Sequence, residues 1–138
     1  MRGVYALALV IASILVLLGL SSSFFSVDRM NTGFMDYRKA VYQSYLQHDV
    51  EYSLRKTFEA IKQQCVALAA LGNPDKCQGE ADIMYANFVA AWSLHGFVMA
   101  GGGVSAIVTP AGADVRLVSD LHWKKGEYEG TIPKGYGG

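Results

Sequence analysis

Residues 4–20 read VYALALVIASILVLLGL, and this almost wholly apolar stretch determines how the rest of the chain is interpreted. No charged residue occurs from Gly3 to Val27. As a helix, this stretch would reach about 37 Å at a rise of ~1.5 Å per residue, which is enough to cross a hydrocarbon core of about 30 Å with some tilt. The sequence therefore predicts a transmembrane helix or anchor over residues 1–27, with membrane lipid as a partner.

The apolar stretch is expected to be retained as an anchor, and a cleaved signal sequence is the alternative. Signal sequences have an apolar core of roughly 7–15 residues followed by small residues, and residues 21–23, three serines, resemble such a site. The apolar run here is longer, which favours an anchor. The side chains expected to face lipid or neighbouring apolar helices are Val4, Leu9, Leu15, Leu20, Phe24 and Phe25.

Composition limits residues 28–138 to a single extramembrane domain. The 138 residues carry 12 basic and 12 acidic side chains, whereas a nucleic-acid partner needs a net basic surface. No catalytic residue, cofactor, metal site or small-molecule ligand is predicted, because the three histidines lack metal-site spacing and Gly101–Gly103 lacks the lysine of a phosphate loop. The chain is not expected to be an enzyme. Other protein subunits, bound through the N-terminal helix, are its expected partners.

Two cysteines, Cys65 and Cys77, are predicted to form a disulfide bond; the alternative is a buried helical thiol and a separate loop thiol. The bond would close a loop of about 13 residues and contribute roughly 3 kcal/mol in the chain-entropy model. Disulfides persist outside the cytosol, whereas Arg29, Arg38 and Lys39 favour a cytoplasmic domain under the positive-inside rule. That rule weakens for long domains, so we expect a single-pass protein with its domain outside the cytoplasm, at the cell surface.

A helical pattern follows the anchor. From residue 34 to residue 71 there is no Gly or Pro, and apolar residues recur in steps of three and four, which predicts a long amphipathic helix. The apolar stripe shifts by one residue midway, which leaves open one helix or two with a kink near Asp49. The stripe forms a core face or a surface for sister subunits. Gly72 ends the helix, and a short helix is predicted over residues 80–94.

The last third of the chain has the pattern of a small antiparallel sheet. The candidate strands are residues 97–99, 104–109, 115–123 and 128–132. A hairpin turn is predicted at Gly101–Gly103, and the tail from Lys134 is expected to be mobile. The predicted fold class is therefore α+β, with an N-terminal transmembrane helix, a long amphipathic helix, a short helix and a β-meander of three or four strands covered by the helices.

This order of elements resembles that of type IV pilins and pilin-like proteins, especially the short archaeal kind. Arg2-Gly3 before the apolar run is similar to the basic-Gly junction at which leaders of that family are cut. The resemblance implies that the apolar helix first sits in the membrane and then bundles at the centre of a filament, with the sheet domain facing outside. Ala8 stands where the family frequently has Glu, and the cysteine loop lies mid-chain, which favours a minor or accessory subunit over a major pilin.

The sequence thus predicts a membrane-anchored structural or interaction protein, a pilin-like surface or filament subunit. One alternative is an accessory single-pass subunit of a larger membrane complex. Another is an extracytoplasmic ligand-binding or sensor module, in which Trp92 and Trp123 would line a pocket. Packing in a hydrophobic core explains these two side chains equally well.

Overall fold

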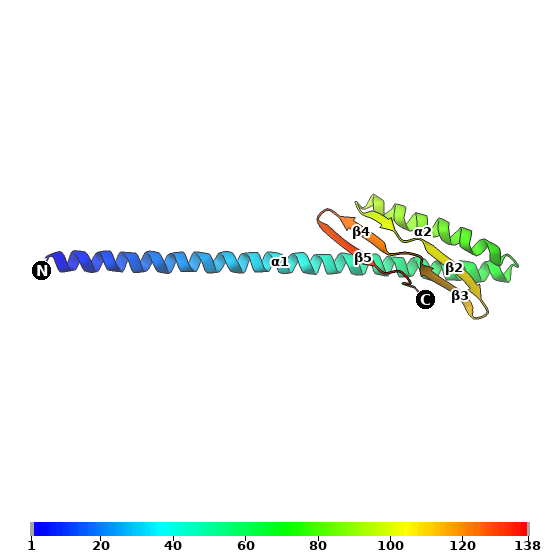
Figure 1. Ribbon diagram of the computed structural model, residues 1–138, viewed down its shortest axis with the longest axis horizontal. Helices are drawn as coiled ribbons and strands as arrows, with labels where there is room; N and C mark the ends of the chain where they lie inside the picture. The colour runs from blue at the N-terminus through cyan, green and yellow to red at the C-terminus, as the bar shows by residue number, and fades with distance from the viewer. Residues whose placement is uncertain (1, 138) are drawn as a thin grey trace. The chain divides into compact units, whose positions relative to one another are not determined.

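A computed structural model describes residues 2–137, with side chains at all of these positions except 2, 4, 5 and 24–28. Three helices come first (Figure 1): α1 (Arg2–Ala70), the 3₁₀ helix η1 (Pro74–Lys76) and α2 (Cys77–Leu94). Five strands follow them: β1 (Val98–Gly101), β2 (Val104–Thr109), β3 (Gly112–Leu117), β4 (Leu121–Lys125) and β5 (Tyr128–Ile132). The predicted α+β class, with helices before antiparallel strands, is confirmed.

Helix α1 is continuous, so the alternative of two helices with a kink near Asp49 is excluded. The helix contains no Pro, and Gly33 costs only about 1 kcal/mol relative to Ala. The first part of α1 lies in one compact unit, residues 1–42, and its second part lies in another, residues 43–138. The packed part of the domain therefore comprises residues 43–138.

The C-terminal end of α1 lies where the sequence predicts it. Gly72 has a φ of +78°, a left-handed conformation that glycine adopts without steric cost. The amide of Asn73 donates to the carbonyl of Leu68 at 2.9 Å, which is the long hydrogen bond of a Schellman motif. The η1 turn then leads directly into α2, which begins at Cys77 rather than at the predicted residue 80.

The strands form two antiparallel sheets, with the orders β1-β4-β5 and β2-β3. Both sheets belong to one ribbon, because β1 and β2 follow each other on one side of it and β3 and β4 on the other. Gly101 faces Leu121, and Val104 faces Leu117, so residues 102–103 lie opposite residues 118–120. One side of the ribbon thus has an extra residue, a β-bulge. This bulge divides the predicted strand 115–123 into β3 and β4, so that five strands form where three or four were predicted.

The hairpin turn predicted at Gly101–Gly103 is wrong, because the chain continues from β1 into β2 along the same ribbon. The three glycines have φ values of +75°, +79° and +84°. These values let the chain pass from one register to the next without reversing. The amide of Gly102 donates to the carbonyl of Asp120 at 2.9 Å, and the amide of Val118 donates to that of Gly103 at 3.1 Å. Hydrogen bonding therefore continues across the glycines.

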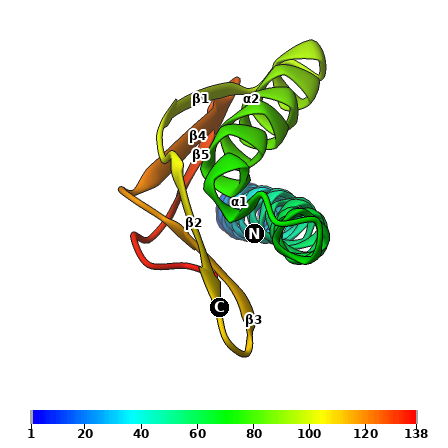
Figure 2. The same cartoon turned by 90° about the vertical axis from the view of Figure 1, so that its right-hand side faces the viewer.

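The core of residues 43–138 lies between the strands and the two long helices, as Figure 2 shows in end view. The predicted stripe of α1 is buried from Leu46 onward, and its fully covered members are Leu46, Val50, Leu54, Phe58, Ile61 and Cys65. The strands contribute Val104, Ala106, Val115, Leu117, Leu121, Trp123 and Ile132. Earlier members of the same stripe, such as Tyr37 and Val41, are exposed. The stripe is therefore a core face only in its later turns.

The C-terminal residues lie along β3, although the sequence predicts a mobile tail from Lys134. The amide of Gly135 donates to the carbonyl of Leu117 at 3.0 Å, and the amide of Leu117 donates to that of Tyr136 at 2.9 Å. These two bonds extend the ribbon beyond β3. The periodicity of the sequence could not predict these bonds, because the segment is short and it pairs through backbone groups of Leu117, which leave no side-chain pattern.

Candidate functional site

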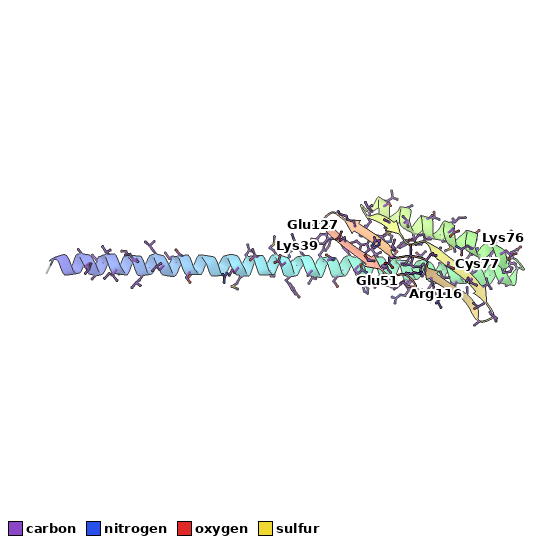
Figure 3. All side chains as sticks on the ribbon, viewed as in Figure 1. Lys39, Glu51, Lys76, Cys77, Arg116 and Glu127 are labelled. Carbon is purple, nitrogen blue, oxygen red and sulfur yellow. A yellow bond between two sulfur atoms is a disulfide. The ribbon has the colours of Figure 1, made fainter. Side chains whose placement is uncertain are left out.

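The candidate site is the exposed apolar part of α1. The window Ala6–Ser23 is long and apolar enough to cross a membrane, and none of its residues is buried. A signal sequence near an N-terminus can be as long and as apolar. Leu9, Leu15 and Leu20 are 69%, 63% and 52% exposed, and Figure 3 shows side chains projecting around this part of the helix. Three of the six side chains predicted to face lipid or other helices lie outside those that the structure describes: Val4, Phe24 and Phe25. A contiguous apolar surface of this kind marks a membrane or protein contact.

Two of the serines in the window, Ser13 and Ser23, hydrogen-bond within their own helix. The Ser13 hydroxyl donates to the carbonyl of Leu9 at 2.8 Å, and the Ser23 hydroxyl donates to that of Gly19 at 3.0 Å. In hydrocarbon an unsatisfied polar group costs several kcal/mol. Because both hydroxyls have acceptors one turn away, these serines are compatible with lipid or with closely packed apolar helices.

Residues 29–42 continue the exposed surface with aromatic and basic side chains. Phe34, Tyr37 and Val41 are 58%, 67% and 50% exposed, and their spacing in steps of three and four gives them one face of the helix. The guanidinium of Arg38 lies 5.7 Å from the centroid of the Phe34 ring, a cation–π distance. Aromatic rings beside basic groups suit the interface between a membrane and water.

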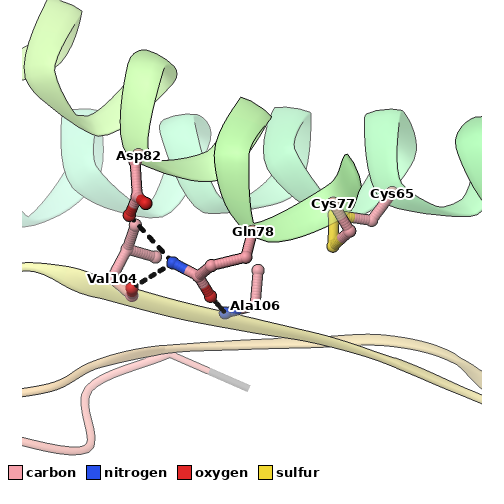
Figure 4. Close-up of a disulfide and its surroundings, with 6 residues drawn as sticks. All are labelled: Cys65, Cys77, Gln78, Asp82, Val104 and Ala106. Carbon is pink, nitrogen blue, oxygen red and sulfur yellow. Dashed lines mark hydrogen bonds between the residues drawn. A yellow bond between two sulfur atoms is a disulfide. The ribbon is translucent and has the colours of Figure 1, made fainter. Parts of the chain in front are cut away.

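Cys65 and Cys77 form the predicted disulfide bond, and their Cα atoms are 4.8 Å apart. Both residues are buried. The bond joins the last turns of α1 to the first residue of α2 (Figure 4), and it therefore fixes the position of α2 on α1. A buried disulfide is typical of proteins from oxidising compartments.

Gln78 closes the edge of β2, although no pattern in the sequence marks it (Figure 4). Its Nε2 donates to the carbonyl of Val104, and its Oε1 accepts from the amide of Ala106, both at 2.9 Å. The side chain thus takes the place of a neighbouring strand. The Nε2 also donates to Asp82 Oδ1 at 2.8 Å. Gln78 therefore satisfies two backbone groups at a strand edge, where unpaired groups can attract other chains.

Two glutamines of α1 close the edge of β5 in the same way. The Nε2 atoms of Gln43 and Gln47 donate to the carbonyls of Glu129 and Thr131, at 2.8 and 3.2 Å. The Oε1 of Gln47 also accepts from the indole N–H of Trp123 at 2.6 Å. Trp123 is 1% exposed, so this tryptophan is held as a core residue.

Tyr85 places its hydroxyl at the glycines between β1 and β2. Among the buried side-chain polar atoms that the structure describes, this hydroxyl is without a partner of full hydrogen-bond geometry. Burial raises the pKa of Tyr85, and the nearby backbone of Gly103 opposes part of that rise. A Cβ at position 102 would overlap the hydroxyl. Gly102 is therefore required both for its backbone conformation and for the space it leaves.

Asp120 and His122, two side chains able to take part in acid–base chemistry, each contact a different partner. Asp120 Oδ1 accepts from the amide of Lys134 at 2.7 Å, and His122 Nδ1 lies 2.9 Å from Thr131 Oγ1. Within residues 2–137, the side chains described include no group of three or more His, Cys, Asp or Glu that could hold a metal ion. No family model, curated protein or solved structure matches the chain. Its function must therefore be argued from the exposed helix and from the domain that follows it.

Proposed function

We propose that the chain is a single-pass membrane protein with a structural or interaction role, anchored by residues 3–27. The observation that carries the proposal is the apolar window Ala6–Ser23, in which no residue is buried. Each Å² of apolar surface left in water costs about 25 cal/mol. Lipid, or the apolar helices of other subunits, is therefore the environment that this window requires.

Retention of the anchor is supported by the continuity of α1. The helix runs unbroken from Arg2 to Ala70, and its later turns supply core residues such as Leu54. The serines at 21–23 lie within this helix. A protease that cuts there would have to unwind it, whereas an anchor uses the helix as it stands.

The domain is proposed to lie outside the cytoplasm. The support is the buried Cys65–Cys77 bond, because cytosolic reductants keep most thiols reduced. The basic residues at 29, 38 and 39 favour the opposite orientation, but they precede a long domain, and long domains cross membranes largely regardless of charge.

The proposed assembly is a pilin-like surface or filament subunit of the minor or accessory kind. Its support is the order of elements, in which an uncovered apolar helix leads directly into the core helix of a small α+β domain. The alternative is an accessory subunit that uses the same helix to bind a larger membrane protein. Ser13 and Gly19 favour this alternative, since small residues let helices approach closely in lipid.

A photo-crosslinking residue at position 15, in place of Leu15, distinguishes the pilin-like subunit from the accessory subunit in cells that express the tagged full chain. A pilin-like subunit gives ladders of this chain with itself, and the tag enters filaments sheared from the surface. An accessory subunit gives one adduct with an unrelated polytopic protein. The matched control is the same crosslinker at Ile107, which is 60% exposed on β2. Monomers that form no adduct at Leu15 contradict an assembly role for the helix.

A further inference from the structure

A cleft of about 370 Å³ lies between α1 and the C-terminal segment of the chain. It is lined by Arg55, Phe58, Glu59, Lys62, Tyr136 and Gly137. We call it the C-terminal cleft. Its volume is near the lower end of the range for ligand sites in proteins, which is about 300–1,000 Å³. The cleft lies wholly within residues 43–138 and is separate from the exposed apolar helix.

Two aromatic side chains give the C-terminal cleft an apolar wall. Phe58 is only 3% exposed, so its ring is fixed by the core. The ring of Tyr136 lies 6.4 Å from that of Phe58, tilted by 49°, and its hydroxyl donates to the carbonyl of Glu51 at 3.4 Å. The hydrogen bonds of the C-terminal segment to β3 hold Tyr136 in this position. The ring that a flat apolar group would contact in the cleft is therefore that of Tyr136, with Phe58 packed behind it.

Among the charged residues that line the C-terminal cleft, Arg55 and Lys62 are basic and Glu59 is acidic, and the charge of nearby Glu51 also acts on Tyr136. Among the residues that the structure describes, neither Arg55 nor Lys62 forms an ion pair, and Arg55 lies over the ring of Tyr52 at 5.5 Å. Glu59, the carboxylate of the cleft, pairs instead with Lys56 at 3.0 Å. The lining of the cleft therefore carries one more basic than acidic side chain, and its carboxylate pairs with a lysine outside the cleft. Guanidinium and ammonium groups placed in this way favour carboxylates and phosphates.

We propose that the C-terminal cleft binds a small amphiphilic anion, a carboxylate or phosphate monoester carried on an aromatic ring or a short acyl chain. Arg55 and Lys62 bind the anionic group, and the ring of Tyr136, supported from behind by Phe58, contacts the apolar body. This activity adds ligand binding to the proposed structural role. It does not depend on that role, because every residue involved belongs to the packed domain.

The probe is 4-fluorophenyl phosphate, titrated against the full chain in nanodiscs of zwitterionic lipid and followed by fluorine NMR. Protein-free nanodiscs give the contribution of partitioning into lipid. Saturable binding is expected, with inorganic phosphate and neutral 4-fluorobenzyl alcohol both binding more weakly than the probe. Failure to saturate by about 10 mM overturns the proposal. If the probe and inorganic phosphate bind with equal affinity, the apolar body contributes nothing and the proposal of an amphiphilic ligand is wrong.

Charge variants test where the probe binds. Arg55→Gln and Lys62→Gln are each expected to weaken binding about tenfold, because each removes one charge-assisted contact. Glu59→Gln is expected to tighten binding, because it removes the carboxylate that lines the cleft. Lys76→Gln is the matched control, an exposed lysine on η1, and should leave the affinity unchanged. If the control weakens binding as much as the cleft variants do, or if Arg55→Gln and Lys62→Gln have no effect, the site assignment is wrong.

Discussion

Gln47 connects three parts of the domain through one amide side chain. It accepts from the buried indole of Trp123 and donates to the carbonyl of Thr131 and to Glu51 Oε1, the last at 2.6 Å. We expect Gln47→Leu to lower the free energy of unfolding by about 2 kcal/mol, because it leaves a buried indole N–H unpaired. Denaturant titration of the full chain in a nonionic detergent, followed by tryptophan fluorescence, measures this loss.

Gln43→Leu is the matched control for this experiment. Gln43 donates to the carbonyl of Glu129 at an exposed position, where water can take its place. Its replacement should cost less than about 1 kcal/mol. Equal losses of unfolding free energy in the two variants would show that the hydrogen bond from the Trp123 indole to Gln47 adds no measurable stability.

Gly102 and Tyr85 form a second pair in which one residue makes room for the other. We expect Gly102→Ala to cost more than about 2 kcal/mol, because the new Cβ meets a positive φ and also overlaps the Tyr85 hydroxyl. In a Tyr85→Phe background the overlap is relieved and the cost should fall toward about 1 kcal/mol. A double-mutant cycle of unfolding free energies checks this, and additive losses would contradict it.

The core stripe of α1 could be predicted from the sequence, whereas the contacts of Gln47 could not. The helix stripe from Leu46 to Cys65 was predictable, because apolar side chains that share a core recur with the helix period. The contacts of Gln47 were not, because its partners lie 76 and 84 residues away and one of them is a backbone carbonyl. An amide side chain at a strand edge has no periodic signature.

At the scale of elements, the long helix and the disulfide followed from local signals, whereas the strand arrangement did not. Gly72 ends α1 in the left-handed conformation that a helix end favours. The glycines at 101–103 have the same local signature, yet they accompany a bulge instead of a hairpin turn. The difference depends on the register of β1 with β4 and of β2 with β3, which composition does not encode.

The Cys65–Cys77 bond is a covalent cross-link between α1 and α2 in addition to the backbone, and its loss should weaken their packing. We expect a Cys65→Ala/Cys77→Ala variant to unfold with a free energy lower by about 3 kcal/mol, the chain-entropy value for a loop of this size. Denaturant titration of the full chain checks the value. The reduced parent protein is the control and should show a similar loss. An unchanged midpoint in both would mean that the packing of α2 on α1 does not need the bond.

At the scale of the whole molecule, the chain combines a packed domain with one exposed apolar helical window near its N-terminus. Residues 43–138 bury a continuous core, whereas no residue of Ala6–Ser23 is buried. The continuity of α1 means that the proposed anchor and the core helix of the domain are one element. Membrane attachment is therefore the claim on which the proposed function depends.

The most direct test of membrane attachment is the intact mass of the chain extracted from carbonate-washed membranes. The predicted result is a mass that includes residues 4–27, whether or not residues 1–3 have been removed. A mature chain that begins after residues 21–23, or a full-length chain recovered only in the soluble fraction, would contradict the proposed anchor.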